Sequence, residues 1–344
     1  MQRRTTKKKV PKRTVLKKKS GGLYYRPEGK TKVFGSGCGL LDCVLGGGWG
    51  VGRVINIVGD KSTGKTLLAI EACANFAKTY DDGRIIYNEV ESAFDVEYAR
   101  TVGLPDERIE FVEDPHTDTV EELFASLQQT IKEADGKPIL YIVDSLDALT
   151  TEVDREKPME QGTYGMAKPK LLGKLFREVV RKLKDKNITF IIISQIRANI
   201  GVVYGKQHTR SGGKALDFYA SQILWLTKLK QIVRTRKGIK RDVAVRIRSR
   251  IEKNKLGPPY RDCEFNILFS YGIDDVMAGV DFLHTAKQLE LLELGTVDPV
   301  KIARTVEQMD RSTFRTFRCD INKHVKAVWR SIEEDFQPKR SKYA

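Results

Sequence analysis

Residues 59–66 read GDKSTGKT, and this stretch decides the expected fold. It matches the pattern GxxxxGK followed by Ser or Thr, and it lies between the apolar run VINIVG (54–59) and the helix-like segment LLAIEACANFAK (67–78). A strand, a glycine-rich turn and a helix in this order form a phosphate-binding loop, because backbone N–H groups and the positive end of the helix dipole meet there. These flanks disfavour the alternative, a glycine-rich turn that binds nothing.

The residues of this loop have separate expected tasks. Lys65 offers a positive charge to phosphates, and the hydroxyl of Thr66 suits Mg²⁺. The expected nucleotide contacts in the loop are Gly59, Asp60, Lys61, Ser62, Thr63, Gly64, Lys65 and Thr66.

Apolar runs alternate with amphipathic segments after this loop. The runs RIIYNEV (84–90), PILYIVDS (138–145) and ITFIIISQ (188–195) alternate with the segments 120–134 and 169–186. This alternation predicts an α/β fold with a mainly parallel central sheet covered on both faces. Beyond residue 220, the three successive runs 222–230, 242–253 and 263–270 predict strands that extend the sheet with antiparallel pairs.

The two ends of the chain differ from this core. Residues 1–32 have few apolar residues and no periodicity, which predicts a basic N-terminal tail or oligomerisation segment. Residues 33–272 are the expected core, and 273–344 are the expected small α-rich C-terminal domain. There the segment 321–336 places five apolar residues on one helix face, as in a packed surface helix. These are Ile321, Val325, Val328, Ile332 and Phe336.

The net charge of +16 is distributed unevenly. Residues 1–32 contain 13 basic residues and one acidic residue, and residues 228–255 contain 12 basic and two acidic residues. Two separate basic regions favour a polyanionic partner such as nucleic acid. For the tail alone, a solvated and disordered segment is an equally good interpretation.

Composition argues against several other classes of protein. The longest apolar runs fall short of the roughly 18 residues of a membrane span, so no membrane association is expected. The five cysteines and four histidines show no metal-ligand spacing. Reduced thiols in a cytoplasmic protein without a zinc site are therefore expected.

Acidic residues follow two of the predicted strands. Asp144 ends the run ILYIVD at the carboxyl edge of the sheet, where it can hold Mg²⁺ through water. Hydrolysis also needs a group that orients or deprotonates water. Glu89 and Glu91 end the neighbouring run, and one of them is the candidate base. The alternatives are a helix cap for Asp144 and a pair of solvated loop acids.

The chain resembles the RecA family of homologous recombinases in several specific motifs. They are GDKSTGKT, NEVESAFDVEYARTVG, LYIVDSLDALT, IIISQIRANIGVVYG, SGGKALDFYAS and EKNKLGPPY, in order over about residues 34–295. The resemblance implies a RecA-type ATPase core, ATP and Mg²⁺ as cofactors, and a head-to-tail helical filament on DNA. The unfamiliar ends favour a phage-type member, acting in the nucleoid or in the cytoplasm of an infected host.

The resemblance also implies roles for individual residues. Glu91 matches the glutamate that activates water, and Glu89 becomes a supporting acid. Asp95 and Tyr98 match adenine contacts, and Gln195 matches the glutamine that senses the γ-phosphate. Lys65, Thr66 and Asp144 match the phosphate lysine and the magnesium ligands. Lys253 and Lys255 match lysines that reach the ATP of the neighbouring subunit, and Phe218 matches an aromatic residue of that interface.

Two segments match the family's DNA-binding loops, about 156–168 and 196–213. In the first loop and the helix after it, the candidate contacts are Tyr164, Met166, Lys168, Lys170 and Arg177. In the second they are Arg197, Asn199, Ile200, Gly201, Val202, Tyr204, Arg210, Gly212 and Gly213. The second mixture offers charge, backbone donors and apolar stacking faces, which suits single-stranded DNA. An ordinary mobile surface loop is the alternative.

The expected function is therefore a DNA-dependent ATPase that coats single-stranded DNA, pairs it with a homologous duplex and exchanges strands. One alternative is a DNA-binding filament that uses ATP only as a regulatory switch. A second is a ring-forming motor ATPase of the same fold. The chain departs from the family by a basic tail in place of an alanine-rich N-terminal helix, and by the ending QPKRSKYA in place of acidic residues. Contact of both tails with duplex DNA is expected for this reason.

Overall fold

The computed structural model describes residues 31–112, 117–156, 167–198, 208–210 and 213–340. Its elements belong to one compact unit, Lys32–Ala344. The helices are α1 Gly39–Leu45, α2 Lys65–Thr79, α3 Val96–Thr101, α4 Val120–Glu133, α5 Glu152–Arg155, α6 Ala167–Asp185, α7 Gly213–Tyr219, α8 Asp275–Thr285, α9 Pro299–Glu307 and α10 Arg311–Asp335. Two 3₁₀ turns span Asp106–Arg108 and Leu289–Leu292.

The strands form a small antiparallel pair and one large mixed sheet. The pair is β1 Val33–Phe34 with β2 Trp49–Gly50. The large sheet has the order β12-β11-β10-β9-β3-β7-β6-β4-β5, and β8 pairs with β7 outside that path. Its strands are β3 Val54–Gly59, β4 Arg84–Glu89, β5 Ile109–Phe111, β6 Ile139–Asp144, β7 Ile188–Ala198, β8 His208–Arg210, β9 Gln222–Arg236, β10 Ile239–Asn254, β11 Asp262–Leu268 and β12 Gly272–Ile273.

The predicted division into parallel and antiparallel strands is confirmed. Strands β5, β4, β6, β7, β3 and β9 run parallel to their neighbours, whereas β9, β10, β11 and β12 pair antiparallel. The central strands are buried along their whole length, as the continuous apolar runs require. Alternate residues of each strand point to opposite faces, so the sheet carries two cores.

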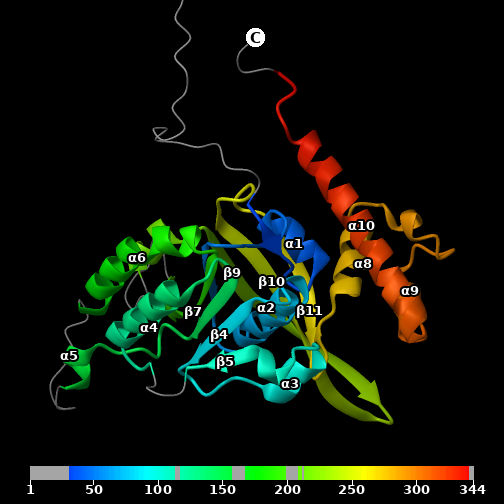
Figure 1. Ribbon diagram of the computed structural model, residues 1–344. Coiled ribbons are helices and arrows are strands. Elements are labelled where there is room, and N and C mark those ends of the chain that lie inside the picture. Colours follow the sequence, from blue (N-terminus) through cyan, green and yellow to red (C-terminus); the bar gives the residue numbers. More distant parts are fainter. Residues whose placement is uncertain (1–30, 113–116, 157–166, 199–207, 211–212, 341–344) are drawn as a thin grey trace, which may run out of the picture. The chain divides into compact units, whose positions relative to one another are not determined.

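Helices cover both faces of this sheet. Ile55, Ile57 and their equivalents in neighbouring strands pack with α1, α2, α8 and α10, whereas Val54 and Val58 pack with α4 and α6. Figure 1 shows α4 and α6 on one side of the sheet and α1 and α2 on the other. The C-terminal helices share the first core through Ile302, Ile321 and Val325, and the boundary at residues 272 and 273 stays a prediction.

Local sequence signals set where the helices begin. Thr119 and Glu122 form a reciprocal capping box at the start of α4. Asp274, Asp298 and Asp310 accept backbone hydrogen bonds at the starts of α8, α9 and α10. These hydrogen bonds fix the N-terminal ends of α4, α8, α9 and α10.

Two details of the sequence interpretation are wrong. The strand expected to end at Gln195 continues to Ala198. Its last three residues are held in the strand by antiparallel pairing with β8. The helical face predicted for 321–336 is packed at Ile321 and Val325, but Phe336 is 78% exposed. It caps the end of α10, beyond the last turn that contacts the core.

Within the described residues, the structure contains no helix that is long and apolar enough to cross a bilayer.

Candidate nucleotide and DNA site

Strand register brings the predicted phosphate loop and the predicted acids to one edge of the sheet. Gly59 at the end of β3 is in register with Gln195 in β7, and Glu89 at the end of β4 is in register with Asp144 at the end of β6. Because these strands are parallel, their carboxyl ends meet at the same edge. A cavity of about 560 Å³ opens there.

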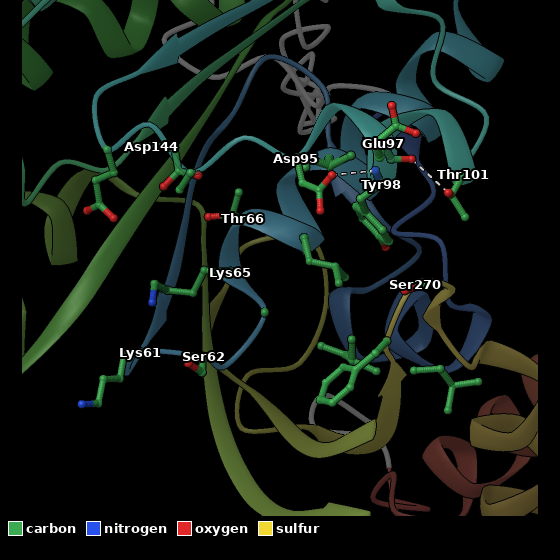
Figure 2. Close-up of a pocket in the computed structure, with 18 of the residues that line it drawn as sticks. Lys61, Ser62, Lys65, Thr66, Asp95, Glu97, Tyr98, Thr101, Asp144 and Ser270 are labelled. Atoms are coloured by element: carbon green, nitrogen blue, oxygen red, sulfur yellow. Dashed lines mark hydrogen bonds between the residues drawn. The ribbon is translucent and has the colours of Figure 1, made fainter. Parts of the chain in front are cut away.

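The loop between β3 and α2 forms one end of this cavity. Lys65 donates from Nζ to the carbonyl of Asp60 at 2.9 Å, and Thr63 donates to the same carbonyl at 2.8 Å. Burial lowers the pKa of Lys65, and the nearby carboxylates of Asp144 and Glu91 act in the opposite direction. Figure 2 shows Lys61, Ser62, Lys65 and Thr66 together at this end. A cationic, partly desolvated loop at a helix N-terminus suits a polyphosphate.

Asp144 is the buried acid of the site. The hydroxyl of Tyr87 donates to its Oδ2 at 2.9 Å, and the side chain of Thr66 is a second hydrogen-bond partner. Burial raises the pKa of Asp144 to about 6. A hydroxyl beside a carboxylate is a hard-oxygen pair, and Mg²⁺ is commonly held by one or two such groups together with phosphate oxygens. Thr66 and Asp144 therefore fit Mg²⁺.

Glu89 and Glu91, the two candidates for the general base, have different surroundings. Both carboxylate oxygens of Glu89 accept backbone hydrogen bonds, from Ala93 and Phe94 at 2.8 Å each. Glu89 thus holds the turn that follows β4. Glu91 instead lines the cavity, and its Oε1 accepts from the hydroxyl of Ser145. Only Glu91 of the two has its carboxylate in the cavity wall, where a water could reach it.

Gln195 joins β7 to this acid. Its side-chain Nε2 donates to Glu91 Oε1 at 2.8 Å, and its backbone N–H donates to Asp147 Oδ2 at 2.7 Å. Gln195 also lines the cavity. The predicted DNA segment, 196–213, begins at the next residue, and its first three residues complete β7, which ends at Ala198. A change in the hydrogen bonds of the Gln195 side chain therefore occurs beside that segment in the chain.

The other end of the cavity is lined by the acidic residues Asp95 and Glu97 and by uncharged residues. Asp95 caps α3 by accepting from the backbone N–H of Tyr98 at 2.8 Å, and the ring of Tyr98 lines the wall. Figure 2 shows Asp95, Tyr98, Thr101 and Ser270 grouped here, away from Lys61 and Lys65. A nucleotide whose phosphates bound at the loop would have its base and ribose at this end.

Sequence reasoning missed one wall of the cavity. Residues 267–270, at the end of β11 and in the turn after it, line the base end. The sequence predicts only an antiparallel strand for them. The one sequence signal is the pair of large aromatic residues Phe269 and Tyr271 beside the turn; the structure shows both to be about half exposed, as side chains of a binding surface often are.

Many predicted DNA contacts lie outside the described residues. These are Tyr164, Met166, Asn199, Ile200, Gly201, Val202, Tyr204 and Gly212. The backbones of Arg197 and Arg210 lie in β7 and β8, and Gly213 begins α7. The two ends of the second loop are thus held together by the pairing of Ile196 with Arg210.

The first-loop lysines differ from one another. Lys168 donates from Nζ to the carbonyls of Asp147 and Leu149, at 3.2 and 2.5 Å. It therefore fastens α6 to the segment after β6. Lys170 and Arg177 are exposed on the same helix.

The predicted interface residues lie together and outside the cavity of their own chain. Lys253 donates to the carbonyls of Asp217 and Phe218 at 2.6 and 2.8 Å, at the end of α7. Phe218 is 71% exposed, and Lys255 is exposed two residues beyond Lys253. Lys253 thus has a contact within its own subunit that the sequence did not predict.

Strands β9 and β10 extend beyond the sheet as a two-stranded arm. Strand β9 pairs with β3 only up to Leu226, and β10 pairs with β11 only from Ala244, so residues 228–242 contact each other. The yellow-green end of this arm projects past the other strands in Figure 1. Its exposed basic residues are Lys228, Lys230, Arg234, Arg236, Lys237, Lys240 and Arg241.

Two arginines of the arm lie directly opposite one another. Arg234 and Arg241 are cross-strand partners, an arrangement that is unfavourable for like charges. Arg234 is partly compensated by Glu307 at 3.2 Å. A surface that holds positive charges this close together is suited to bind an anionic partner.

Comparisons with known proteins point to one family. The family model described as RecA N-terminal domain matches residues 8–274. The chain is 34% identical to Protein RecA of Synechococcus sp. (strain CC9902) over 247 residues, which are 72% of this chain and 62% of that protein. It is 33% identical to Protein RecA of Arthrospira platensis over 252 residues, which are 73% of this chain and 66% of the relative. It is also 33% identical to Protein RecA of Prochlorococcus marinus (strain AS9601) over 244 residues, covering 71% and 64%. The chain thus spans somewhat less than two thirds of the length of these relatives.

Proposed function

The chain belongs to the RecA family, and from this premise we propose that it is an ATP-dependent DNA recombinase. It assembles head to tail into a helical filament on single-stranded DNA, pairs that strand with a homologous duplex and exchanges strands. ATP with Mg²⁺ is the cofactor, and DNA-dependent ATP hydrolysis drives release. The protein acts in the cytoplasm, at the nucleoid or on phage DNA in an infected host.

The observation that carries this proposal is the contact of Gln195 with Glu91 at the wall of the cavity. Glu91 faces the expected position of the γ-phosphate, and Gln195 lies in β7, the strand that leads to the predicted DNA segment. A phosphate-binding ATPase needs only the loop and the acids. The link from the acid to β7 is what a nucleotide-controlled DNA binder requires in addition.

The chemistry assigns one task to each group. Lys65 binds the phosphates as a point charge, and Thr66 and Asp144 hold Mg²⁺, which neutralises developing phosphate charge when it is bound. Glu91 accepts a proton from the attacking water. Gln195 donates its amide hydrogens to the γ-phosphate, and Asp95 and Tyr98 bind adenine. Loss of the phosphate releases the Gln195 amide, and this release couples the state of the nucleotide to DNA binding.

DNA binding is assigned to two surfaces. The loops before α6 and between β7 and β8 bind the single strand, with Lys170 and Arg177 of α6 adding phosphate contacts. The arm of β9 and β10 supplies a second basic surface for the duplex. The backbone of the single strand is held by charge and its bases by apolar contacts.

Assembly follows from a site shared between subunits. Lys253, Lys255 and Phe218 of one subunit face the ATP of the next, and such head-to-tail contacts generate a helix. Their position outside the cavity of their own chain supports this assignment. ATP binding and filament formation are then coupled.

Two alternatives make different predictions. A DNA-binding filament switched by ATP would assemble without exchanging strands, and a ring-forming motor would close into rings. Electron microscopy with single-stranded DNA, Mg²⁺ and a non-hydrolysable ATP analogue separates the filament from the ring. Helical filaments support the proposal, and closed rings contradict it.

Salt dependence tests the mode of DNA binding. If each subunit neutralises about three phosphates, the logarithm of the affinity for single strands falls with the logarithm of salt concentration at a slope of about −2 per subunit. A flat dependence would contradict phosphate tracking.

A further inference from the structure

A partly buried carboxylate lies behind the base end of the cavity. Glu71, on α2, accepts a hydrogen bond at its Oε1 from the hydroxyl of Tyr98 at 3.1 Å. Tyr98 is only 8% exposed, but its ring forms part of the cavity wall. Burial raises the pKa of Glu71, while the hydrogen bond from Tyr98 lowers it. The carboxylate is therefore held in a poorly solvated place by a residue of the nucleotide site.

Two glycines enclose this pair. A Cβ atom at Gly37 would lie 2.7 Å from Oε2 of Glu71, and one at Gly272 would lie 2.6 Å from the hydroxyl of Tyr98 and 3.1 Å from Oε1 of Glu71. Both glycines have positive φ angles, of 94° and 109°. The backbone thus passes close to both side chains, and a residue with a side chain at either glycine would collide with the pair.

The carboxylate also connects three parts of the site. Its helix α2 begins at Lys65, Tyr98 comes from α3, and Gly272 follows the turn that contains Ser270. The neighbouring cation Arg318 donates to Asp275 at 2.6 Å, so it is committed to another carboxylate. The hydrogen bond from Tyr98 therefore connects Glu71 to the base end of the cavity.

We propose that Glu71 is a positioning residue for the nucleotide base. It fixes the hydroxyl of Tyr98 and thereby sets the plane of the ring against which a purine packs. Glu71 is not one of the described residues that line the cavity, so it acts through Tyr98 and does not touch the nucleotide. This inference rests on the proposed nucleotide site and adds a residue that determines how the base is held.

Loss of the hydrogen bond between Glu71 and Tyr98 should affect only the binding of the nucleotide base. A ring that is free to rotate must be ordered when a base packs against it, and this ordering reduces affinity. The phosphate contacts come from the loop before α2 and do not depend on Tyr98. Loss of the Glu71 hydrogen bond should therefore weaken ATP binding by about tenfold, the effect of one hydrogen bond to a charged group. Binding of inorganic tripolyphosphate, which has no base, should be unchanged.

The test is calorimetric titration of the full chain with ATP and with tripolyphosphate, each in the presence of Mg²⁺. The variants are Glu71→Ala, Tyr98→Phe, the double variant and Glu71→Gln. We expect Glu71→Ala and Tyr98→Phe to weaken ATP binding and the double variant to be no weaker than either. Glu71→Gln keeps an acceptor and should bind ATP within about twofold of the unaltered chain. Tripolyphosphate should bind all of them equally.

Equal losses for both ligands, or no loss for ATP, would overturn the inference. Thermal unfolding of each variant accompanies the titrations, and if Glu71→Ala does not fold, Tyr98→Phe and Glu71→Gln still decide the question. Failure of the unaltered chain to bind either ligand would instead contradict the proposed nucleotide site. The two failures are therefore distinguishable.

Discussion

The side-chain amide of Gln195 donates a hydrogen bond to Oε1 of Glu91 at 2.8 Å, across 104 positions of sequence. The same oxygen accepts from Ser145, and the backbone N–H of Gln195 is held by Asp147 at 2.7 Å. A γ-phosphate would compete for the Gln195 amide, because a neutral amide donates equally well to a phosphate oxygen. The contact thus connects the proposed hydrolytic acid to the strand that continues into the proposed DNA-binding segment.

Replacing Gln195 tests this connection. Gln195→Ala should leave ATP affinity largely intact, because the phosphate loop and base contacts remain. It should abolish the stimulation of ATP hydrolysis by single-stranded DNA, since the segment after β7 no longer responds to the phosphate. Steady-state hydrolysis with and without DNA measures this directly. Normal stimulation in the variant would show that coupling takes another route.

Glu91 and Glu89 form a matched pair for the hydrolytic role. Glu91→Gln should reduce the hydrolysis rate by about a hundredfold or more, the usual contribution of a general base, with ATP binding retained. Glu89→Gln places an amide against the N–H of Ala93 or Phe94 and should cost about 1 to 3 kcal/mol of stability. Single-turnover hydrolysis and urea unfolding separate the effects. A rate loss confined to Glu89→Gln would reverse the assignment.

The shared ATP site predicts complementation between two inactive variants. Lys255→Ala removes an exposed side chain and should leave stability unchanged while DNA-dependent hydrolysis falls. Lys65→Ala should be inactive in its own cavity. A mixture should recover activity where an intact Lys65 meets the intact Lys255 of a neighbour. A mixture no more active than the sum of its parts would argue that each cavity is complete within one subunit.

Lys253 should behave differently from Lys255. It donates to two carbonyls at the end of α7, so Lys253→Ala should lower the free energy of unfolding by about 1 kcal/mol as well as reduce hydrolysis. Urea denaturation of the two lysine variants in parallel measures the contrast. Equal stability of both would mean that the contact within the subunit contributes nothing.

The partly buried acid Asp42 predicts a pH dependence of stability. Its Oδ1 accepts from the backbone and hydroxyl of Ser36, and burial nevertheless raises its pKa from 3.8 to about 6. The folded chain therefore binds a proton that the unfolded chain releases between these values. The stability that this proton contributes is present below about pH 4 and is lost as the pH rises through about 6.

Asp42→Asn has no carboxyl group to titrate at this position. Its free energy of unfolding should therefore fall less than that of the unaltered chain between pH 4.5 and 7. Urea unfolding at several pH values measures the difference in slope. Parallel curves would mean that Asp42 keeps its ordinary pKa in the folded chain.

The sequence predicted the parts of the site that depend on local patterns. The loop 59–66 and Asp144 follow continuous apolar strands, and parallel strands necessarily bring such ends to one edge. The inner parts of β9 and β10 are also predicted, by the apolar runs 222–230 and 242–253, but the strands continue to Arg236 and from Ile239 in an exposed arm that the sequence did not predict. These features follow from chain periodicity, which does not depend on distant contacts.

What the sequence left undetermined depends on contacts between distant segments. Whether Glu89 or Glu91 faces the cavity is decided by the turn at Ala93, and pattern alone left both open. Residues 267–270 reach the base end only because β11 lies beyond β10 and β9 in the sheet. Lys253 was assigned to a neighbouring subunit, and its contact with α7 of its own chain required the fold.

The central claim is that this chain exchanges DNA strands under the control of ATP. It is tested most directly by incubating the protein with circular single-stranded DNA, linear duplex, ATP and Mg²⁺, and measuring joint molecules. We predict joint molecules with a homologous duplex and none with a heterologous duplex or without nucleotide. Absence of joint molecules from a preparation that hydrolyses ATP in response to single-stranded DNA would contradict the claim and favour an ATP-switched DNA-binding filament.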